Sequence, residues 1–346
     1  MKKWIGLLAG VFALSVALTA CNTGGASSGT SSASSSGAAS HPAVTVRFGY
    51  VDGGKSVPSG VYGIGKNQGY FDKELKKVNA TIQFIPFTGA GPAINSALAG
   101  GSLDLGNLGD VPALVAKASG IDTIAISGGM STVGAQLVVP AGSTATSIKD
   151  LKGKRVATQK GAFMHRVLLK MLQANGMTIN DIEFVNMSAV VAKAAIVSKS
   201  IDAAVLPTAN AQTVILGNGA KDILNGDEHP DWLSSGETVV LSDFAKKNPD
   251  VLVAFEKGLI ESKKYADQHP EALRQNLIDT GLTEDVINAT YPTKNYGDAI
   301  ELDSKVIASL KDVNKFSLDN QVIQTSVNID KWVNNSYYQK ALKELK

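Results

Sequence analysis

Short apolar runs alternate with amphipathic stretches along the chain from residue 41 onward. Nine of the apolar runs have the length and composition of β-strands, at residues 44–50, 81–87, 103–108, 123–126, 136–139, 155–158, 182–186, 203–206 and 238–241. Several stretches between them carry apolar residues at three- and four-residue spacing, which predicts helices at 91–99, 111–119, 163–174 and 189–199. Alternating strands and helices predict an α/β protein with parallel sheets and helices on both sheet faces.

The pattern changes after about residue 244, where helical spacing replaces the alternation. Pro270, Gly281, Pro292 and Asn320 separate the apolar stretches and mark helix ends. We expect a helical C-terminal tail with helices at 244–269, 270–280, 284–289, 302–311 and 329–345.

Residues 1–20 have the pattern of a secretory signal. Lys2 and Lys3 precede an apolar run at 4–18, whose 15 residues fall short of the ~20 that an uncleaved helix needs to span a bilayer. The Leu-Thr-Ala-Cys sequence that ends at Cys21 resembles the bacterial lipobox, in which the cysteine thiol receives a diacylglycerol and the leader is cut before it. We therefore expect a signal peptide at 1–20 and a lipid anchor on Cys21.

A segment without charges or large apolar side chains follows at 22–40, where 8 of 19 residues are Ser, 4 are Gly and 4 are Ala. Such a segment cannot bury enough surface to offset the entropy of ordering it. It predicts a flexible tether that spans about 25 Å. Residues 21–42 would thus hold a folded domain near a membrane.

Charge and cysteine content exclude several classes of function. The formal net charge is +2, and removing Lys2 and Lys3 with the leader leaves 31 basic residues against 31 acidic ones. A nucleic-acid partner is not expected, because binding it would need a basic excess. The single cysteine cannot form an internal disulfide, and no Cys or His cluster suggests a metal site. We expect neither a metal nor a cofactor.

Several predicted helices begin where predicted strands end. Asp110, with a proline at 112, has the pattern of a helix N-cap, Gly161 precedes another helix, and Pro207 and Thr208 open a third. Ligands of α/β sheets bind beyond the carboxyl ends of the strands, where helix N-termini present free amides. These turns are suited to an anion.

Four sequence blocks together resemble one family. Residues 98–112, Leu-Ala-Gly-Gly-Ser-Leu-Asp-Leu-Gly-Asn-Leu-Gly-Asp-Val-Pro, resemble a segment of the substrate-binding lipoproteins for aliphatic sulfonates, taurine and nitrate. Residues 150–161 resemble the entry to the second lobe of these proteins, 200–207 a strand and helix start within it, and 65–71 the end of their first helix. The resemblance covers about residues 44–250.

The resemblance implies a type II periplasmic binding protein fold, in which two crossing hinge strands join two α/β lobes. Lobe one would comprise residues 43–130 and 237–346, and lobe two residues 131–236. The crossings are expected at 124–130 and 237–241. Two glycines in the first crossing suit a hinge, because glycine tolerates the dihedral changes of lobe closure.

The resemblance also implies which loops face a ligand in the cleft between the lobes. The predicted ligand-binding residues are Asp52, Gly53, Gly54, Gly89, Gly91, Asn107, Gly109, Asp110, Lys160, Gly161, Ala162, His165, Pro207 and Thr208. For the glycines, plain turn chemistry is the alternative. The glycine spacing does not form a Gly-x-Gly-x-x-Gly motif, so dinucleotide binding is not expected.

Three of the polar candidates have alternative roles. Asp110 is interpreted first as a helix cap and second as a ligand contact. Lys160 and Arg166 flank a helix start where a cation would suit a sulfonate or carboxylate, although a solvated face explains either, and Arg166 is the less expected to point inward. His165 is either a ligand contact or a capping or core histidine.

The sequence predicts binding rather than catalysis. The four histidines lie far apart in the sequence, and the carboxylates of Asp227 and Glu228 look solvated. We expect a monomeric, lipid-anchored, extracytoplasmic receptor of an ABC transporter, which delivers a small-molecule ligand to a permease and its ATPase. The alternatives are an enzyme or a thiamine-pyrimidine-precursor binding protein of the same superfamily, or a sensor domain.

The expected ligand is a small anionic or zwitterionic solute, sulfonate-like or taurine-like. Nitrate and thiamine precursors remain alternatives. Asp52, Lys55 and Asp110 form a mixed set of charges that fits a zwitterion somewhat better than a bare anion. The tether suits either a periplasmic face or a Gram-positive surface.

Overall fold

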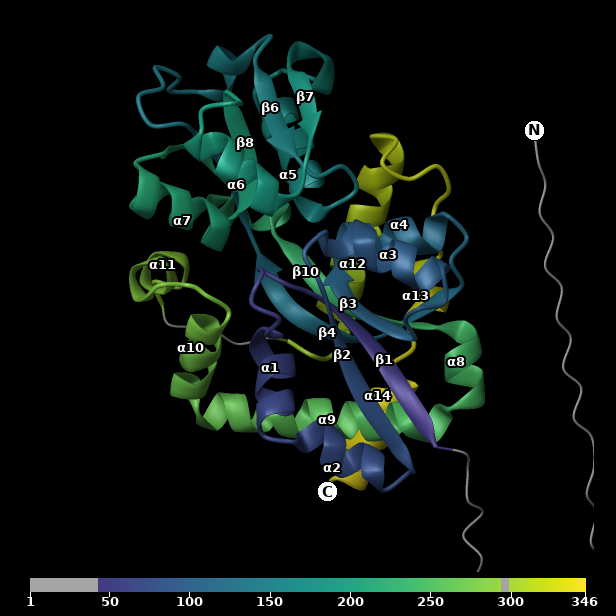
Figure 1. The fold of residues 1–346 in the computed structure, drawn as a ribbon. Coiled ribbons are helices and arrows are strands. Elements are labelled where there is room, and N and C mark those ends of the chain that lie inside the picture. Colours follow the sequence, from purple (N-terminus) through teal and green to yellow (C-terminus); the bar gives the residue numbers. More distant parts are fainter. Residues whose placement is uncertain (1–42, 294–298) are drawn as a thin grey trace, which may run out of the picture. The chain divides into compact units, whose positions relative to one another are not determined.

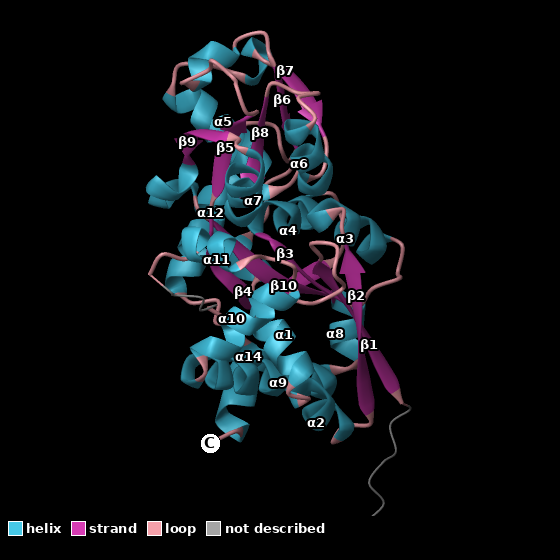
Figure 2. Ribbon diagram, turned by 60° about the vertical axis from the view of Figure 1, so that its left-hand side comes forward, coloured by secondary structure: helices cyan, strands magenta, loops and turns pink. Residues whose placement is uncertain are grey.

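A computed structural model describes residues 43–293 and 299–346, so the expected leader, Cys21 and the tether lie outside the described residues. These residues form two five-stranded sheets (Figures 1 and 2). The first has the order β2 (Ala80–Phe87), β1 (Val44–Val51), β3 (Leu105–Gly109), β10 (Ser234–Leu241), β4 (Thr123–Val133). The second has the order β7 (Glu183–Asn186), β6 (Arg155–Thr158), β8 (Ala203–Pro207), β5 (Ala135–Val139), β9 (Lys221–Asn225).

Both sheets are mixed, so the prediction of parallel sheets holds only in part. β1 is parallel to β2 and β3, and β6 is parallel to β7 and β8, as the strand–helix alternation predicts. In contrast, β10 is antiparallel to β3 and β4, and β5 is antiparallel to β8 and β9. The chain passes from β4 in the first sheet to β5 in the second through Gly134, and it returns to the first sheet with β10. The α/β fold class is confirmed.

Helices cover both faces of each sheet. In the first lobe, defined here as the first sheet and its helices, one face is covered by α1 (Gly60–Asn67), α2 (Tyr70–Lys76), α9 (Pro249–Gln268) and α14 (Ser336–Glu344). The other face is covered by α3 (Ala90–Ala99), α4 (Asp110–Ala118), α12 (Ser304–Asp319) and α13 (Ile329–Trp332). In the second lobe, the second sheet is covered by α5 (Phe163–Ala174) on one face and by α6 (Ala189–Val197) and α7 (Thr208–Asn218) on the other.

The helical tail differs from the prediction at two breaks and at the end of one helix, since the predicted helix 302–311 continues in α12 to Asp319. The predicted helix 244–269 is divided into α8 (Ser242–Lys247) and α9, because Pro249 has no amide hydrogen and disfavours a helical Asn248 before it. The predicted helix 329–345 is divided into α13 and α14 at Val333, which forms a bridge with Ala125 of β4. The other tail helices are α10 (Pro270–Asp279) and α11 (Glu284–Thr290).

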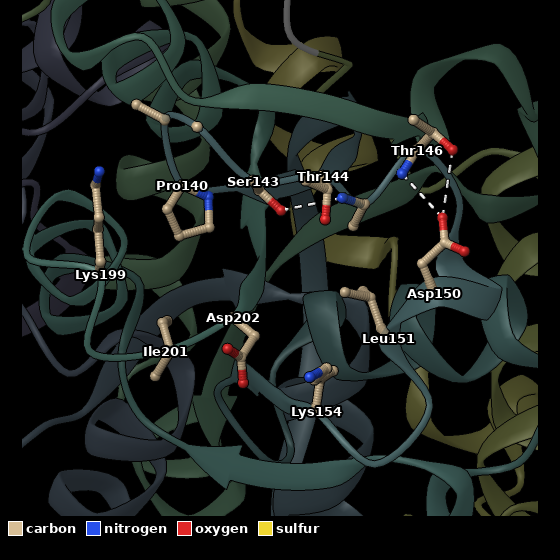
Figure 3. Close-up of a pocket in the computed structure, with 13 residues that line it drawn as sticks. Pro140, Ser143, Thr144, Thr146, Asp150, Leu151, Lys154, Lys199, Ile201 and Asp202 are labelled. Atoms are coloured by element: carbon tan, nitrogen blue, oxygen red, sulfur yellow. Dashed lines mark hydrogen bonds between the residues drawn. The ribbon is translucent and has the colours of Figure 1, made fainter.

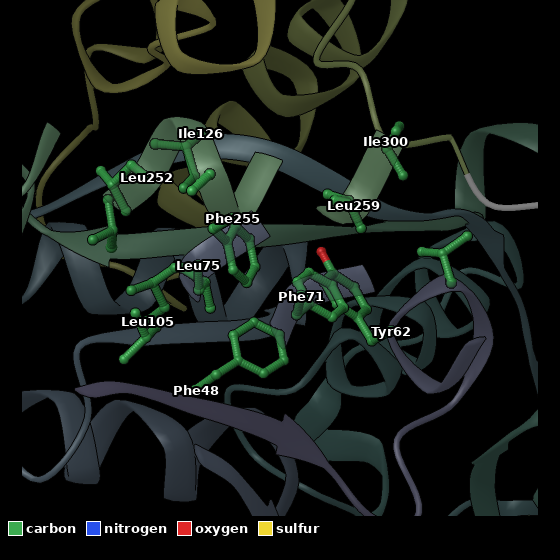
Figure 4. Packing of buried hydrophobic residues seen from close by; sticks show 14 of the residues in the cluster. Phe48, Tyr62, Phe71, Leu75, Leu105, Ile126, Leu252, Phe255, Leu259 and Ile300 are labelled. Atoms are coloured by element: carbon green, nitrogen blue, oxygen red, sulfur yellow. The ribbon is translucent and has the colours of Figure 1, made fainter. Parts of the chain in front are cut away.

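Aromatic side chains form the centre of the core on one face of the first sheet (Figure 4). Phe48 of β1 packs against Tyr62 of α1 with ring centroids 5.0 Å apart, and Phe71 of α2 stacks on Phe255 of α9 at 5.2 Å. All four side chains are buried. Burial of each such ring contributes about 1.5–3 kcal/mol, so this cluster fixes three helices to the sheet.

Candidate functional site

Loops at the carboxyl ends of strands from the two lobes contact each other. The side chain of Gln159, after β6, donates a hydrogen bond from Nε2 to the carbonyl oxygen of Gly89, after β2, at 2.8 Å. Phe163, the first residue of α5, packs against the cores of both lobes. A Cβ atom on Gly109 would lie 3.8 Å from the Cβ of Phe163. The predicted site segments around Gly89, Gly109 and Lys160 therefore lie together.

The predicted residues of the first lobe follow β1, β2 and β3. Asp52 is buried, and its carboxylate accepts hydrogen bonds from the backbone amides of Gly54, Lys55 and Ser56 at 2.9–3.3 Å. Gly53 lies in this loop, and Gly54 has a φ of +106° that favours glycine. The carboxylate of Asp52 thus organises its own loop.

Packing explains Gly91 better than a close approach to a ligand. A Cβ atom at this position in α3 would lie 2.4 Å from the Cβ and Cγ atoms of Pro112 in α4. Gly89 is the N-cap of the same helix. Asn107 lies in β3, and its buried Nδ2 donor has no hydrogen-bond partner among the described residues. Of these three, Asn107 therefore has the free polar group that a ligand could use.

The prediction that Asp110 is a helix N-cap is wrong. Gly109 is the N-cap of α4, and Asp110 is the first helical residue, with a side chain that is 0% exposed. Its carboxylate accepts a hydrogen bond from the hydroxyl group of Ser234, and Oδ2 lies 3.6 Å from Nη2 of Arg166. The side chain is thus held between β10 and the second lobe.

The expectation that Arg166 would point inward less readily than Lys160 is also wrong, because the side chain of Arg166 is 2% exposed while Lys160 is exposed. Its Nη2 donates hydrogen bonds to the carbonyl oxygens of Trp232 and Leu233 at 3.1 and 2.6 Å. These carbonyls and the carboxylate of Asp110 replace water around Nη2, whereas Nε is buried and has no hydrogen-bond partner among the described residues.

Glu237 completes this buried group and was not among the predicted residues. It lies in β10 opposite Leu108 and Gly128, it is fully buried, and Oε1 accepts a hydrogen bond from the hydroxyl group of Ser235 at 2.5 Å. Burial, and then the charge of Asp110, raise the pKa of Glu237 well above its usual value. Its surroundings therefore favour the neutral form of this carboxyl group over the charged form. A carboxylate in a strand of a largely apolar sheet is the sequence signal that could have identified it.

The helix α5 begins with amides that have no side-chain cap. Ala162 is its N-cap, Gly161 before it has a φ of +77°, and Lys160 is exposed. His165 is buried, and burial followed by the charge of Lys160 lowers its pKa to about 4, so the imidazole is neutral at pH 7. Its Nδ1 is buried without a partner among the described residues, and its ring lies 5.4 Å from that of Phe184. A helix start with a neighbouring lysine can bind an anionic group.

The last two predicted residues open α7. Pro207 is its N-cap, and the hydroxyl group of Thr208 donates to the carboxylate of Asp227, with both oxygens at 2.9 Å. Asp227 is half-buried, and burial raises its pKa, so the prediction that it is solvated is wrong. Glu228 is exposed as predicted.

A hollow of about 590 Å³ lies away from these residues (Figure 3). It is lined by the loop 140–146, by Lys154, which directly precedes β6, and by Asp202, which directly precedes β8. The predicted site instead follows the carboxyl ends of β6 and β8. The hollow and the predicted site are thus at opposite ends of the same strands.

Residues 43–293 and 299–346 contain neither a cluster of metal ligands nor a membrane-spanning helix. No group of three or more His, Cys, Asp or Glu side chains could hold a metal ion there. No helix in that part of the chain is long and apolar enough to cross a membrane.

The chain is similar to proteins named for sulfonate and taurine binding. It is 26% identical over 289 residues to an aliphatic sulfonates-binding protein of Bacillus subtilis (strain 168), covering 81% of this chain and 84% of that protein. It is 30% identical over 200 residues to the taurine-binding periplasmic protein of Escherichia coli (strain K12), covering 57% and 61%. The periplasmic sulfonate-binding protein SsuA of Methylobacillus flagellatus KT has a similar structure, with a TM-score of 0.69, 27% identity and coverage of 87% and 94%.

The two-lobed periplasmic binding protein fold is therefore confirmed. The same fold occurs in the desulfurization enzyme DSZB, which is 15% identical with a TM-score of 0.67, so the fold alone does not decide between binding and catalysis. The family described as NMT1/THI5 like matches residues 59–273, more than half of the sequence, and the chain belongs to that family.

Proposed function

We propose that the protein is the extracytoplasmic solute-binding receptor of an ABC transporter and that it captures a small sulfonate between its lobes. The observation that carries the proposal is the start of α5, where uncapped amides and Lys160 adjoin a loop that contacts Gly89 of the other lobe. Free amides at a helix N-terminus and a cation both stabilise a sulfonate. A ligand that contacts both lobes favours their closed arrangement.

The carboxylates in the first lobe favour an anion over a zwitterion, which changes the expectation from the sequence. Asp52 is engaged by three amides of its own loop, and Asp110 by Arg166 and Ser234. An ammonium group would find neither carboxylate free. We therefore expect an alkanesulfonate to bind more tightly than taurine.

Calorimetric titration of the mature chain with ethanesulfonate, taurine and nitrate tests this proposal. Ethanesulfonate should bind most tightly, and at 100 times its dissociation constant it should add about 2.7 kcal/mol to the free energy of unfolding. Absence of binding of all three solutes would contradict the proposed function. Equal affinities for taurine and ethanesulfonate would contradict the argument from the engaged carboxylates but not the proposed function.

We also propose that Cys21 carries a lipid and that residues 21–42 tether the receptor to the outer face of a membrane, near its permease and ATPase. The support is the lipobox-like sequence that ends at this cysteine. Cells that produce the chain should incorporate labelled palmitate into it. Labelling that persists in Cys21→Ala would contradict the anchor.

The receptor is proposed to act as a monomer and without catalysis. Relatives with 26% and 30% identity are named for binding, which supports the absence of catalysis, whereas DSZB shares only the fold. Ethanesulfonate incubated with the purified chain should be recovered unchanged by mass spectrometry. Loss of sulfite from it, in proportion to the amount of chain, would favour an enzyme.

A further inference from the structure

One face of α5 lies against the first lobe. Phe163, Arg166, Lys170 and Gln173 are spaced three or four residues apart, which places them on the same side of the helix. Phe163 packs against the first lobe's core, the Nζ of Lys170 lies 5.3 Å from the ring centroid of Phe316, and Gln173 donates to Oδ1 of Asn320 at 2.6 Å. Phe316 and Asn320 belong to the end of α12 in the first lobe.

The centre of this face is the contact between Arg166 and Asp110. The two side chains are 2% and 0% exposed, and they belong to different lobes. Within its own lobe, Arg166 contacts only neutral carbonyl oxygens at 231–233. If the lobes separated at this point, the buried guanidinium of Arg166 would lose its counter-ion, the carboxylate of Asp110. This loss costs free energy until water hydrates the guanidinium.

The groups that make this contact, the carboxylate of Asp110 and Nη2 of Arg166, are already engaged. The Nε of Arg166 is buried and has no hydrogen-bond partner among the described residues. The carboxylate of Asp110 also contacts the hydroxyl group of Ser234 and the backbone amides of Val111 and Ser235. The other charged and titratable groups beside the contact are Glu237 in β10, Lys170 in α5 and Asp231 before β10. Lys170 and Asp231 pair with each other at 3.0 Å, so they do not compete for Asp110 or Arg166.

We propose that Asp110 and Arg166 form an interlobe latch, which favours the closed arrangement of the lobes before any ligand binds. The latch raises ligand affinity without touching the ligand, and this second effect rests on the proposed function. An apparent dissociation constant rises when the binding-competent arrangement is less populated. Asp110 and Arg166 are thus positioning residues.

The test measures the separation of the lobes without ligand. In a Cys21→Ala background, Lys76→Cys on α2 and Lys154→Cys before β6 give one exposed labelling site in each lobe, and the chain has no other cysteine. Energy transfer between two fluorophores reports how often the lobes are apart. Asp110→Asn should increase the population with low transfer, and Asp231→Asn should not, because Asp231 pairs with Lys170 inside the second lobe.

The second readout is the affinity for ethanesulfonate. Asp110→Asn should weaken binding by about tenfold or more. Saturating ligand should restore the efficiency of energy transfer between the fluorophores to that of the parent protein. A ligand-free distribution in Asp110→Asn that equals the parent's would overturn the latch. If ethanesulfonate does not bind the parent, the proposed function fails, while the ligand-free distances still decide on the latch.

A second variant is needed if Asp110→Asn fails to fold. The absence of a cooperative thermal transition would show that failure. Arg166→Lys keeps the positive charge, but its single ammonium cannot hold the carbonyl oxygens of 232–233 and Asp110 with the geometry of a guanidinium. It should produce the same increase in the low-transfer population. An unchanged distribution in a folded Arg166→Lys protein would overturn the latch.

Discussion

The hydroxyl group of Tyr62 lies 3.1 Å from the carbonyl oxygen of Gly128 and donates a hydrogen bond to it. The same hydroxyl group is hydrogen-bonded to that of Thr238. Gly128 lies in β4 and Thr238 in β10, the two strands by which the chain crosses between the sheets. Through this one side chain, α1 therefore connects both crossing strands.

Tyr62→Phe should destabilise the protein by about 1–2 kcal/mol. The substitution keeps the ring, which packs against Phe48, and removes buried hydrogen bonds that contribute about 1 kcal/mol each. Urea unfolding measures the change in the free energy of unfolding. Tyr70→Phe is the matched control. Tyr70 lies near the surface at the start of α2, so this variant should lose little free energy of unfolding. Equal losses in both variants would contradict the role of the hydroxyl group.

Gly63→Ala should destabilise the protein by roughly 2–3 kcal/mol, because the added methyl group has no room. A Cβ atom there would lie 2.2 Å from both the carbonyl oxygen of Pro58 and Nδ2 of Asn276. These two groups are hydrogen-bonded to each other at 3.0 Å, which joins α10 to the start of α1.

Gly217→Ala is the control for this substitution. A Cβ atom on Gly217, in α7, would meet no atom within 4 Å. Alanine is favoured over glycine in a helix by up to about 1 kcal/mol, so this variant should be neutral or slightly more stable. Thermal unfolding of the two variants should therefore show changes in melting temperature that differ in sign or size. Similar shifts would show that the space around Gly63 can adapt.

Local pattern was sufficient to predict elements with strong periodicity. The predicted strand 155–158 and helix 163–174 have the same limits as β6 and α5, because apolar spacing and flanking turns define both ends. The strand β9 was missed, since Lys221 and Asp222 make its first half polar, as is common in an edge strand.

The buried polar group could not be predicted from local pattern. Arg166 finds its acceptors 65–67 residues later in the chain, and its counter-ion Asp110 belongs to the other lobe. A helical position with a charged side chain normally indicates a solvated face, and only the long-range pairing reverses this for Arg166. Tertiary contacts likewise make Asp110 a buried ion-pair partner rather than a cap.

Glu256 should make the stability of the protein fall as the pH rises. It is fully buried in α9, and burial raises its pKa from the usual 4.5 to about 8, opposed by Ser127. The folded state therefore keeps a proton that the unfolded chain loses above pH 4.5. The stabilisation is complete below that pH and is lost, by about 1.4 kcal/mol for each pH unit, up to about pH 8.

Glu256→Gln should remove this slope, so the variant should gain stability relative to the parent between pH 5.5 and 7.5. The measurement is urea unfolding at several pH values across that interval. Glu344→Gln is the control, because a hydrogen bond from Lys257 lowers the pKa of Glu344, which is then ionised in both states over the interval. Burial also raises the pKa of Glu237 and Asp227, so part of the parent's slope should remain in the variant. A slope in Glu256→Gln equal to that of the parent would show that Glu256 is not a cause.

Lys160→Ala should weaken the binding of ethanesulfonate by about tenfold or more. A hydrogen bond to a charged group contributes about 1.5–3 kcal/mol, and the ammonium group of Lys160 is exposed beside the uncapped start of α5. Lys154→Ala removes the same charge from the same lobe but at the opposite end of β6, so it should leave the affinity unchanged. Calorimetry compares the two variants with the parent. Because Lys160 lowers the pKa of His165, that pKa should also rise in Lys160→Ala, which proton resonances of the imidazole can measure without any ligand. Equal affinities in the parent and both variants would assign Lys160 to the solvated surface.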